Sequence, residues 1–145
     1  MHELSIAQTI VETVVSEAEA RPAERVAQID VDVGELMQLD RRALAAGLRV
    51  LLDGSGLKGA RVRLHVEGAA FNCRRCDKQW GMAEAKRQLE RVPDALRVRE
   101  PDSREIPLHF LPQLYPAFLR CPGCGSSDVL ASRGKEIRVR GVLFA

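Results

Sequence analysis

The chain has 145 residues, of which 46% are hydrophobic and 29% are charged. This composition argues against general disorder, and the length predicts one domain with room for a small appendage. The net charge is only +2, so an attraction to nucleic acid would require a local basic surface.

The sequence carries no recognisable membrane or export signal. No apolar run approaches the roughly 20 residues that span a bilayer. The start, Met1-His2-Glu3-Leu4, lacks the basic residues and apolar block of a signal peptide, so we expect a cytoplasmic protein. In a reducing compartment, four cysteines are more often metal ligands or redox groups than structural disulfides.

A change of hydrophobic period marks the first helix and strand. Apolar side chains recur every three to four residues over residues 3–20, which predicts an amphipathic helix. The helix ends at Arg21 because Pro22 disfavours helical geometry in the residue before it. Residues 26–33 then alternate apolar and polar side chains, which is typical of a half-buried strand, and Gly34 closes it.

A second helix and strand follow. Asp40 is suited to cap a helix over residues 41–53. Alternation over residues 61–67 predicts the second strand. His65 lies on the polar side of that strand, where we expect it to face solvent.

The remaining chain contains an insert and a final strand. Two C-x-x-C pairs enclose 44 residues that hold five of the seven prolines. Within them, residues 82–92 predict a short charged helix and residues 93–107 a loop. Alternation from Ile137 to Arg140 predicts a strand that returns to the first sheet, because three strands with a helical cover are about the minimum for independent stability.

The predicted fold class is therefore α+β. We expect a small three-stranded sheet covered by two helices, with an inserted four-cysteine, zinc-ribbon-like domain. Residues 1–70 plus 126–145 form the α/β domain in this prediction, and residues 71–125 form the cysteine domain.

The four cysteines are spaced as two ligand pairs, Cys73-Arg74-Arg75-Cys76 and Cys121-Pro122-Gly123-Cys124. A two-residue spacer lets both sulfurs of a pair reach one ion, and tetrahedral zinc takes four thiolates at about 2.3 Å. Gly125 can adopt a left-handed conformation and direct its N–H at a sulfur. Four thiolates on Zn²⁺ leave a negative charge that four nearby cations can offset: Arg74, Arg75, Lys78 and Arg120.

The magnitude of zinc binding favours a structural role. Bound zinc contributes of order 10–16 kcal/mol in small folds, as much as the whole stability of a typical domain, about 5–15 kcal/mol. A closed site of four thiolates leaves no open position for catalysis. Two redox dithiols and four unrelated buried cysteines remain alternatives. A nucleic-acid-binding zinc ribbon is another, although 4% aromatic residues leave little for base stacking.

The first two residues offer a different kind of metal site. The amine of Met1, the backbone nitrogen of His2 and Nδ1 of His2 can close two fused chelate rings on one metal. Such planar nitrogen ligands favour Ni(II) or Cu(II) over zinc or magnesium. His109 could fold back to complete the plane. The alternatives are that His2 lies in a frayed terminus and that His109 is a surface or packing residue.

These motifs, in this order, resemble the HypA/HybF family of nickel metallochaperones. The matching segments are Met1-His2-Glu3-Leu4-Ser5, Val33-Gly34-Glu35-Leu36, the two cysteine pairs and Gly125-Ser126. The resemblance spans nearly the whole chain. Many members have a shorter stretch between the cysteine pairs, so this chain is similar to the longer-loop variety.

The resemblance implies a nickel-binding α/β domain and a zinc domain. By matched position, His2 binds nickel together with the Met1 amine, Glu3 is the neighbouring motif residue of that site, and the four cysteines bind zinc. In the longer-loop variety, a histidine placed as His109 is can approach the N-terminal site.

The resemblance also implies a function. The protein would deliver Ni(II) to the large subunit of [NiFe]-hydrogenase, with a nickel-handling GTPase, HypB, as its partner. An enzyme is not expected, because the sequence has no Gly-rich phosphate loop, no open-site metal cluster and no convincing Ser/His/Asp set.

Overall fold

The computed structural model describes residues 2–99, 104–106, 108 and 112–145. The chain divides into two compact units. Met1–Val33, Leu39–His65 and Ile137–Ala145 form the first, which we call the helix–sheet unit. Gly34–Gln38 and Val66–Glu136 form the second, which we call the cysteine unit. Over the described ranges, no helix has the length and apolar character needed to cross a membrane.

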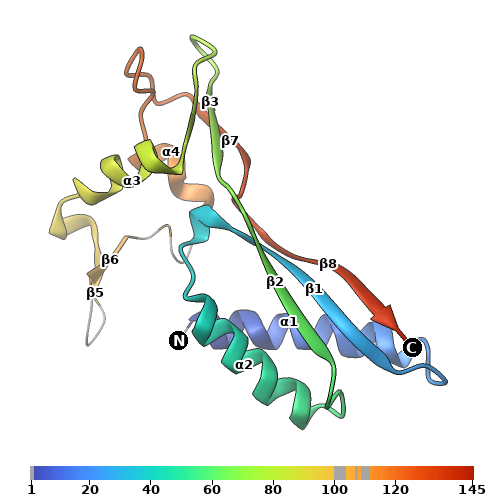
Figure 1. The fold of residues 1–145 in the computed structure, drawn as a ribbon. Helices are drawn as coiled ribbons and strands as arrows, with labels where there is room; N and C mark the ends of the chain where they lie inside the picture. The colour runs from blue at the N-terminus through green and yellow to red at the C-terminus, as the bar shows by residue number, and fades with distance from the viewer. Residues whose placement is uncertain (1, 100–103, 107, 109–111) are drawn as a thin grey trace. The chain divides into compact units, whose positions relative to one another are not determined.

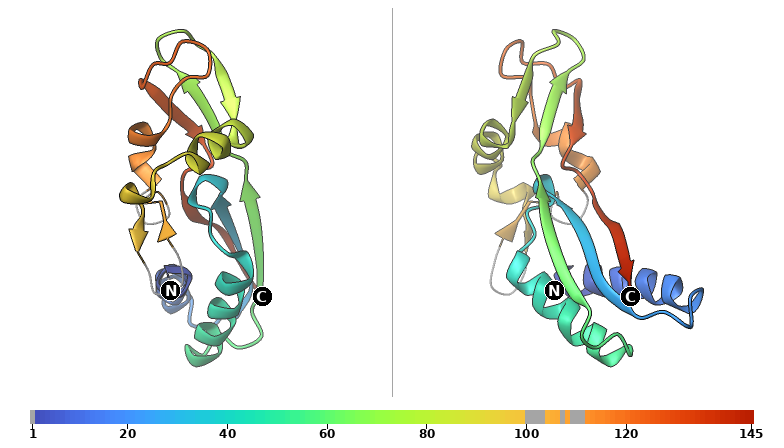
Figure 2. Two further views of the ribbon diagram at one scale, coloured as in Figure 1. Left: turned by 90° about the vertical axis from the view of Figure 1, so that its left-hand side faces the viewer. Right: turned by 45° about the vertical axis from the view of Figure 1, so that its right-hand side comes forward.

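The helix–sheet unit is a three-stranded sheet with both of its helices on one face (Figures 1 and 2). The strand order is β2-β1-β8, and β8 runs antiparallel to β1 with Val33 opposite Ile137. The fold class predicted from the sequence is therefore confirmed. The elements are α1 (His2–Glu19), β1 (Val26–Gly34), α2 (Arg41–Gly54), β2 (Arg61–Glu67) and β8 (Ile137–Phe144).

The apolar stripes of the two helices meet the apolar side of the sheet in one core. Its buried residues are Ala7, Ile10, Val11, Val14, Val26, Ile29, Val31, Val33, Leu44, Leu48 and Leu52. Because successive side chains of a strand point to opposite faces, Asp30 and Asp32 of β1 lie on the face away from the helices.

The start of α2 follows the predicted cap. The side chain of Asp40 accepts hydrogen bonds from the backbone N–H groups of Arg42, at 2.9 Å, and Ala43, at 3.2 Å. These bonds satisfy two of the N–H groups that the first turn of a helix leaves without an intrahelical partner.

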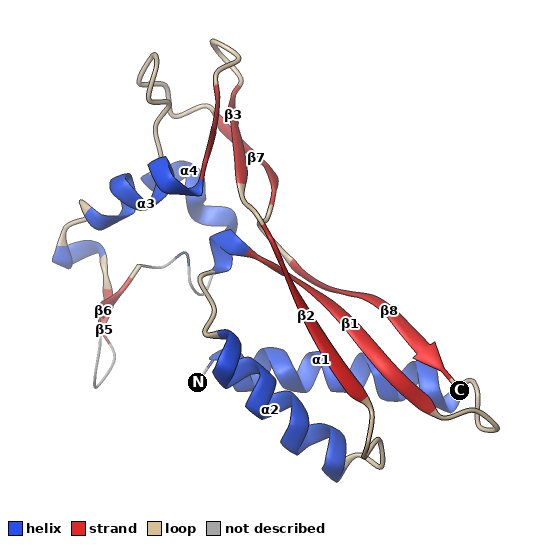
Figure 3. Ribbon diagram, in the orientation of Figure 1, coloured by secondary structure: helices blue, strands red, loops and turns tan. Residues whose placement is uncertain are grey.

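The cysteine unit contains a second three-stranded sheet, ordered β4-β3-β7, and a two-stranded pair of β5 and β6 (Figure 3). Phe71 is at the centre of its core, 5.8 Å from the ring of Trp80 and 6.2 Å from that of Tyr115, measured between centroids. The helical elements are η1 (Glu35–Met37), α3 (Met82–Glu90), η2 (Asp94–Leu96), η4 (Pro112–Leu114) and α4 (Tyr115–Phe118). The strands are β3 (Ala70–Cys73), β4 (Gln79–Gly81), β5 (Val98–Arg99), β6 (Arg104–Glu105) and β7 (Val129–Arg133).

The prediction of a plain loop over residues 93–107 is wrong for its described part. That part contains η2, and β5 pairs with β6 through Val98 opposite Glu105. Strands of two residues are too short to leave a period-two pattern in the sequence, so alternation could not reveal them.

Close backbone packing within the cysteine unit explains the glycine of the segment Val33-Gly34-Glu35-Leu36. A Cβ on Gly34 would lie 2.5 Å from the carbonyl oxygen of Gly134, which itself has a φ of +72°. The carboxylate of Glu35 accepts the N–H of Ala69 at 3.1 Å, and that of Glu67 accepts the N–H of Gly134 at 2.9 Å. Gly34 and Glu35 therefore act together where three chain segments approach each other.

Candidate metal centre

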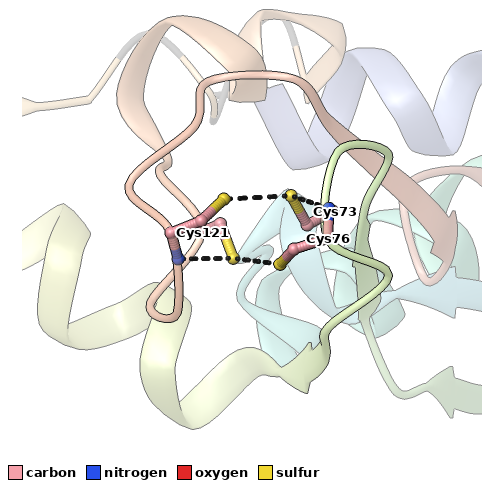
Figure 4. Close-up of side chains that lie close together, drawn as sticks. Cys73, Cys76 and Cys121 are labelled. Carbon is pink, nitrogen blue, oxygen red and sulfur yellow. Dashed lines mark hydrogen bonds between the residues drawn. The ribbon is translucent and has the colours of Figure 1, made fainter.

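The four cysteine sulfurs form a single cluster (Figure 4). All four Sγ atoms lie within 4.8 Å of one another. The Sγ atoms of Cys73 and Cys124 are 3.6 Å apart, and those of Cys76 and Cys121 are 3.5 Å apart. A tetrahedron with metal–sulfur bonds of about 2.3 Å has edges of about 3.8 Å. The cluster therefore fits a tetrahedral ion such as zinc.

The first cysteine pair lies at the end of β3, where the chain turns tightly. Asp77 adopts a φ of 62° and donates its N–H to the carbonyl oxygen of Cys73 at 2.8 Å. The N–H of Cys76 points at the sulfur of Cys73, 3.4 Å away. The turn thus places both sulfurs on one side and directs a backbone donor at one of them.

The second pair is shaped by a matching turn, with one difference from the expectation. Gly125 is left-handed, with a φ of +76°, as expected. Its N–H, however, binds the carbonyl oxygen of Cys121 at 2.9 Å rather than a sulfur. The N–H groups of Gly123 and Cys124 approach the Cys121 sulfur instead, at 3.3 and 3.5 Å. The N–H of Gly125 therefore closes the turn, and the N–H groups of Gly123 and Cys124 are the ones that reach the sulfur.

Hydrogen bonding differentiates Cys121 from Cys76. Burial raises the pKa of the Cys121 thiol, but the N–H groups of Cys124 and Gly123 outweigh that effect and lower the pKa to about 6. At Cys76, a hydrogen bond with the backbone of Lys78 acts to lower the pKa of the thiol. The hydrogen bond between the Cys76 thiol and the Cys121 sulfur, together with burial, acts in the other direction and raises the pKa of Cys76 to about 12.

The cations expected to offset the thiolate charge differ in their contacts. Arg74 forms an ion pair with Asp128 at 3.7 Å. The guanidinium of Arg120 donates to the carbonyl oxygens of Pro116 and Leu119. Lys78 lies against the second turn, since a Cβ on Gly123 would be 2.9 Å from its Cδ.

The N-terminal candidate site is described only in part. Met1 and His109 lie outside the described residues, and His2 is the first residue of α1. Glu3 is buried, and its carboxylate accepts the backbone N–H of Asp40 at 3.1 Å. This contact ties the first turn of α1 to the start of α2. Sequence reasoning placed Glu3 in the motif but gave no signal for its partner.

His65 lies on the polar side of β2, as expected, but it has a partner there. Its Nε2 is 3.2 Å from a carboxylate oxygen of Asp30, and both side chains are partly buried. Within the described chain, the cysteine quartet is the one cluster of three or more potential metal-ligating side chains.

Comparison with known proteins identifies the family. Residues 1–143 match a family model described as "Hydrogenase/urease nickel incorporation, metallochaperone, hypA". The chain belongs to the HypA family. HypA of Pyrococcus furiosus, a hydrogenase maturation factor, is 33% identical over 144 residues, which cover 99% of this chain and 96% of that protein. The same factor of Pyrococcus horikoshii is 32% identical over 142 residues, which cover 98% and 94%.

The fold agrees with this family. The solution structure of the Ni metallochaperone HypA from Helicobacter pylori matches with a TM-score of 0.56 and 16% identity, covering 97% of this chain and 94% of that one. The cysteine cluster thus lies within a fold that this chain shares with that HypA structure.

Proposed function

We propose that the protein is a nickel metallochaperone that binds Ni(II) at its N-terminus and delivers it for maturation of [NiFe]-hydrogenase. The match to the HypA family over nearly the whole chain carries this proposal. The relatives named above are hydrogenase maturation factors. Each alignment covers nearly all of this chain and nearly all of the relative.

In this proposal the nickel is cargo, held by the amine of Met1 and the nitrogens of His2. Glu3 supports the site by fixing the first turn of α1, because its carboxylate holds the N–H of Asp40. His109 is the further proposed ligand. Nitrogen ligands and planar geometry select nickel over zinc. Protonation of the imidazole, or movement of one ligand, then permits release to a partner protein.

The resident metal is proposed to be Zn(II), bound by Cys73, Cys76, Cys121 and Cys124 in a structural role. Sulfur separations near those of a tetrahedral thiolate site support this assignment. Zinc with four thiolates has no open position, so it shapes the cysteine unit and takes no part in the transfer.

The proposed partners are a HypB-type nickel GTPase and the hydrogenase large subunit, and the proposed location is the cytoplasm. A chaperone binds and releases its cargo without making or breaking covalent bonds in a substrate. We therefore propose that the protein is not itself an enzyme, and any GTP hydrolysis belongs to the partner.

The test is a metal titration of the untagged protein. Wild type is expected to contain one zinc per chain and to bind Ni(II) in isothermal titration calorimetry. His2→Ala is expected to keep its zinc and its circular dichroism spectrum but to lose nickel binding. Equal nickel affinity in the two proteins would exclude the N-terminal site, and wild type without zinc would exclude the four-thiolate zinc site.

A further inference from the structure

Gln88 of α3 forms an unusual contact with the backbone beside the second cysteine pair. Its Nε2 donates to the carbonyl oxygen of Arg120 at 2.8 Å, and its Oε1 accepts the N–H of Arg120 at 2.7 Å. A glutamine amide presents a donor and an acceptor side by side, as a peptide group does. Gln88 therefore binds Arg120 as a neighbouring β-strand would.

This contact joins two parts of the metal centre that are distant in sequence. Helix α3 follows the first cysteine pair through β4, whereas Arg120 directly precedes Cys121. Residues 88 and 120 are 32 positions apart. The two hydrogen bonds thus close the base of a long insert, and closing such a loop costs conformational entropy that these contacts must offset.

The other side of the second pair is held differently. Past Cys124, the carbonyl oxygen of Asp128 accepts the N–H of Arg74 at 2.9 Å, and Val129 pairs with Cys73 in the ladder of β3 and β7. Sheet hydrogen bonds therefore fix the chain after Cys124. On the side before Cys121, the buried side chain of Leu119 fixes a position in the core. The N–H of Cys121 donates to the carbonyl oxygen of Ser126 at 2.9 Å, and the Gln88 amide holds the backbone of the residue just before it.

The direction in which the backbone leads from Arg120 into the second cysteine turn affects the position of the Cys121 sulfur. Cys121 is buried, and its sulfur receives two N–H groups from its own turn. That arrangement brings its Sγ to 3.5 Å from that of Cys76. A rotation of the chain at Arg120 would turn this sulfur away from the first pair, even if the core beneath remained packed.

We propose that Gln88 is a positioning residue for the cysteine quartet, which holds the second pair at its entry and closes the insert at its base. The proposal rests on the zinc assignment made above. It goes beyond that assignment by naming a residue outside the ligand set that controls how firmly the metal is kept. Gln88 does not touch the metal and acts only through the backbone of Arg120.

The experiment measures zinc transfer from the fully loaded, full-length protein to excess 4-(2-pyridylazo)resorcinol at 25 °C. Gln88→Ala removes both hydrogen bonds to Arg120, together with the longer contact of the same Nε2 with Glu84 one turn away, at 3.3 Å. We expect zinc to leave about tenfold faster than from wild type, which corresponds to about 1.4 kcal/mol. Gln88→Glu keeps an acceptor for the Arg120 N–H but places an oxygen opposite the Arg120 carbonyl and the Glu84 carboxylate, so it should also lose zinc faster than wild type.

A matched control is Gln8→Ala on α1, where the glutamine amide contacts only Glu12 one turn away among the described residues. Its zinc transfer rate should equal that of wild type. Cobalt substitution supplies a second readout. The visible bands of the Co(II) form of Gln88→Ala should shift, while circular dichroism reports an unchanged helix content. A general loss of stability would lower the unfolding temperature without altering the bands of the folded protein.

Three results separate the possible outcomes. Faster zinc loss with altered cobalt bands in Gln88→Ala supports the proposal. If that variant does not fold, the same two changes in Gln88→Glu support it. A transfer rate and cobalt spectrum equal to those of wild type in a folded Gln88 variant overturn it. Wild type that holds no zinc contradicts the metal assignment of the preceding section instead.

Discussion

Whether the role of a single side chain can be predicted depends on how far away its partner lies in the sequence. The role of Asp40 could be predicted, because a capping aspartate binds the N–H groups that directly follow it. The cysteine pairs could be predicted because their spacing alone restricts the geometry of the site. Glu3 and Gln88 could not be assigned, since each binds a backbone group more than 30 residues away.

The carboxyl of Asp32 makes the free energy of unfolding depend on pH. It is buried, and a hydrogen bond from Arg140 holds the pKa of its carboxyl below the usual value, with Arg138 adding to the effect. Because the pKa of this carboxyl is lower in the folded protein than in the unfolded chain, its ionisation stabilises the fold. This stabilisation is fully present above the pKa of the unfolded chain, about 3.9, and is lost as the pH falls through the pKa of the folded protein.

We therefore expect wild type to lose stability below about pH 4 more steeply than Asp32→Asn. The measurement is urea denaturation at steps of pH from 6 to 2.5. Asp53→Asn, a change at an exposed position of α2, is the matched control and should follow wild type. Parallel curves for wild type and Asp32→Asn would show that the arginine pair does not stabilise the folded state.

At the scale of elements, length decides what the sequence reveals. The helices α1, α2 and α3 and the strands β1 and β2 extend over enough residues to show a hydrophobic period, and the observed bounds lie within two residues of the predicted ones. For β8 the alternation predicts only Ile137 to Arg140, and the strand continues to Phe144. The strands β3, β4 and β7 have three to five residues and lie beside the cysteine turns, where no alternation stands out. Their pairing depends on the fold of the cysteine unit rather than on local pattern.

Gly34 lies where the end of β1 closely approaches the backbone of Gly134 and Glu136. Gly34→Ala would place a Cβ 2.5 Å from the carbonyl oxygen of Gly134 and 2.6 Å from that of Glu136. Because backbone must shift to relieve such contacts, we expect a loss of about 1–3 kcal/mol in the free energy of unfolding. Gly54→Ala, which meets nothing within 4 Å, should change it by less than about 1 kcal/mol. Equal unfolding free energies for the two variants would contradict this packing.

At the scale of the whole molecule, the two units have separate apolar cores. The helix–sheet unit is held by apolar packing between α1, α2 and the sheet. The cysteine unit has its own apolar core, and the end of β3 and the second cysteine turn meet at the sulfur cluster. We infer that zinc removal affects the second unit first.

Trp80, the one tryptophan of the chain, makes this testable because it packs on Phe71 in the cysteine unit. Chelation of zinc should change its fluorescence, while the helical circular dichroism signal of α1 and α2 persists. Loss of both signals together at the same chelator concentration would show that the two units unfold as one.

The central claim is that the first residues of the chain hold nickel through their own nitrogens. It is tested most directly by calorimetric Ni(II) titration of two zinc-loaded proteins, one starting at Met1 and the other carrying one additional glycine before it. The added residue removes the free amine of Met1 from the site and leaves every side chain in place. We predict that the unextended protein binds one Ni(II) and that the extended protein binds it far more weakly. Equal affinity in the two proteins would contradict the claim.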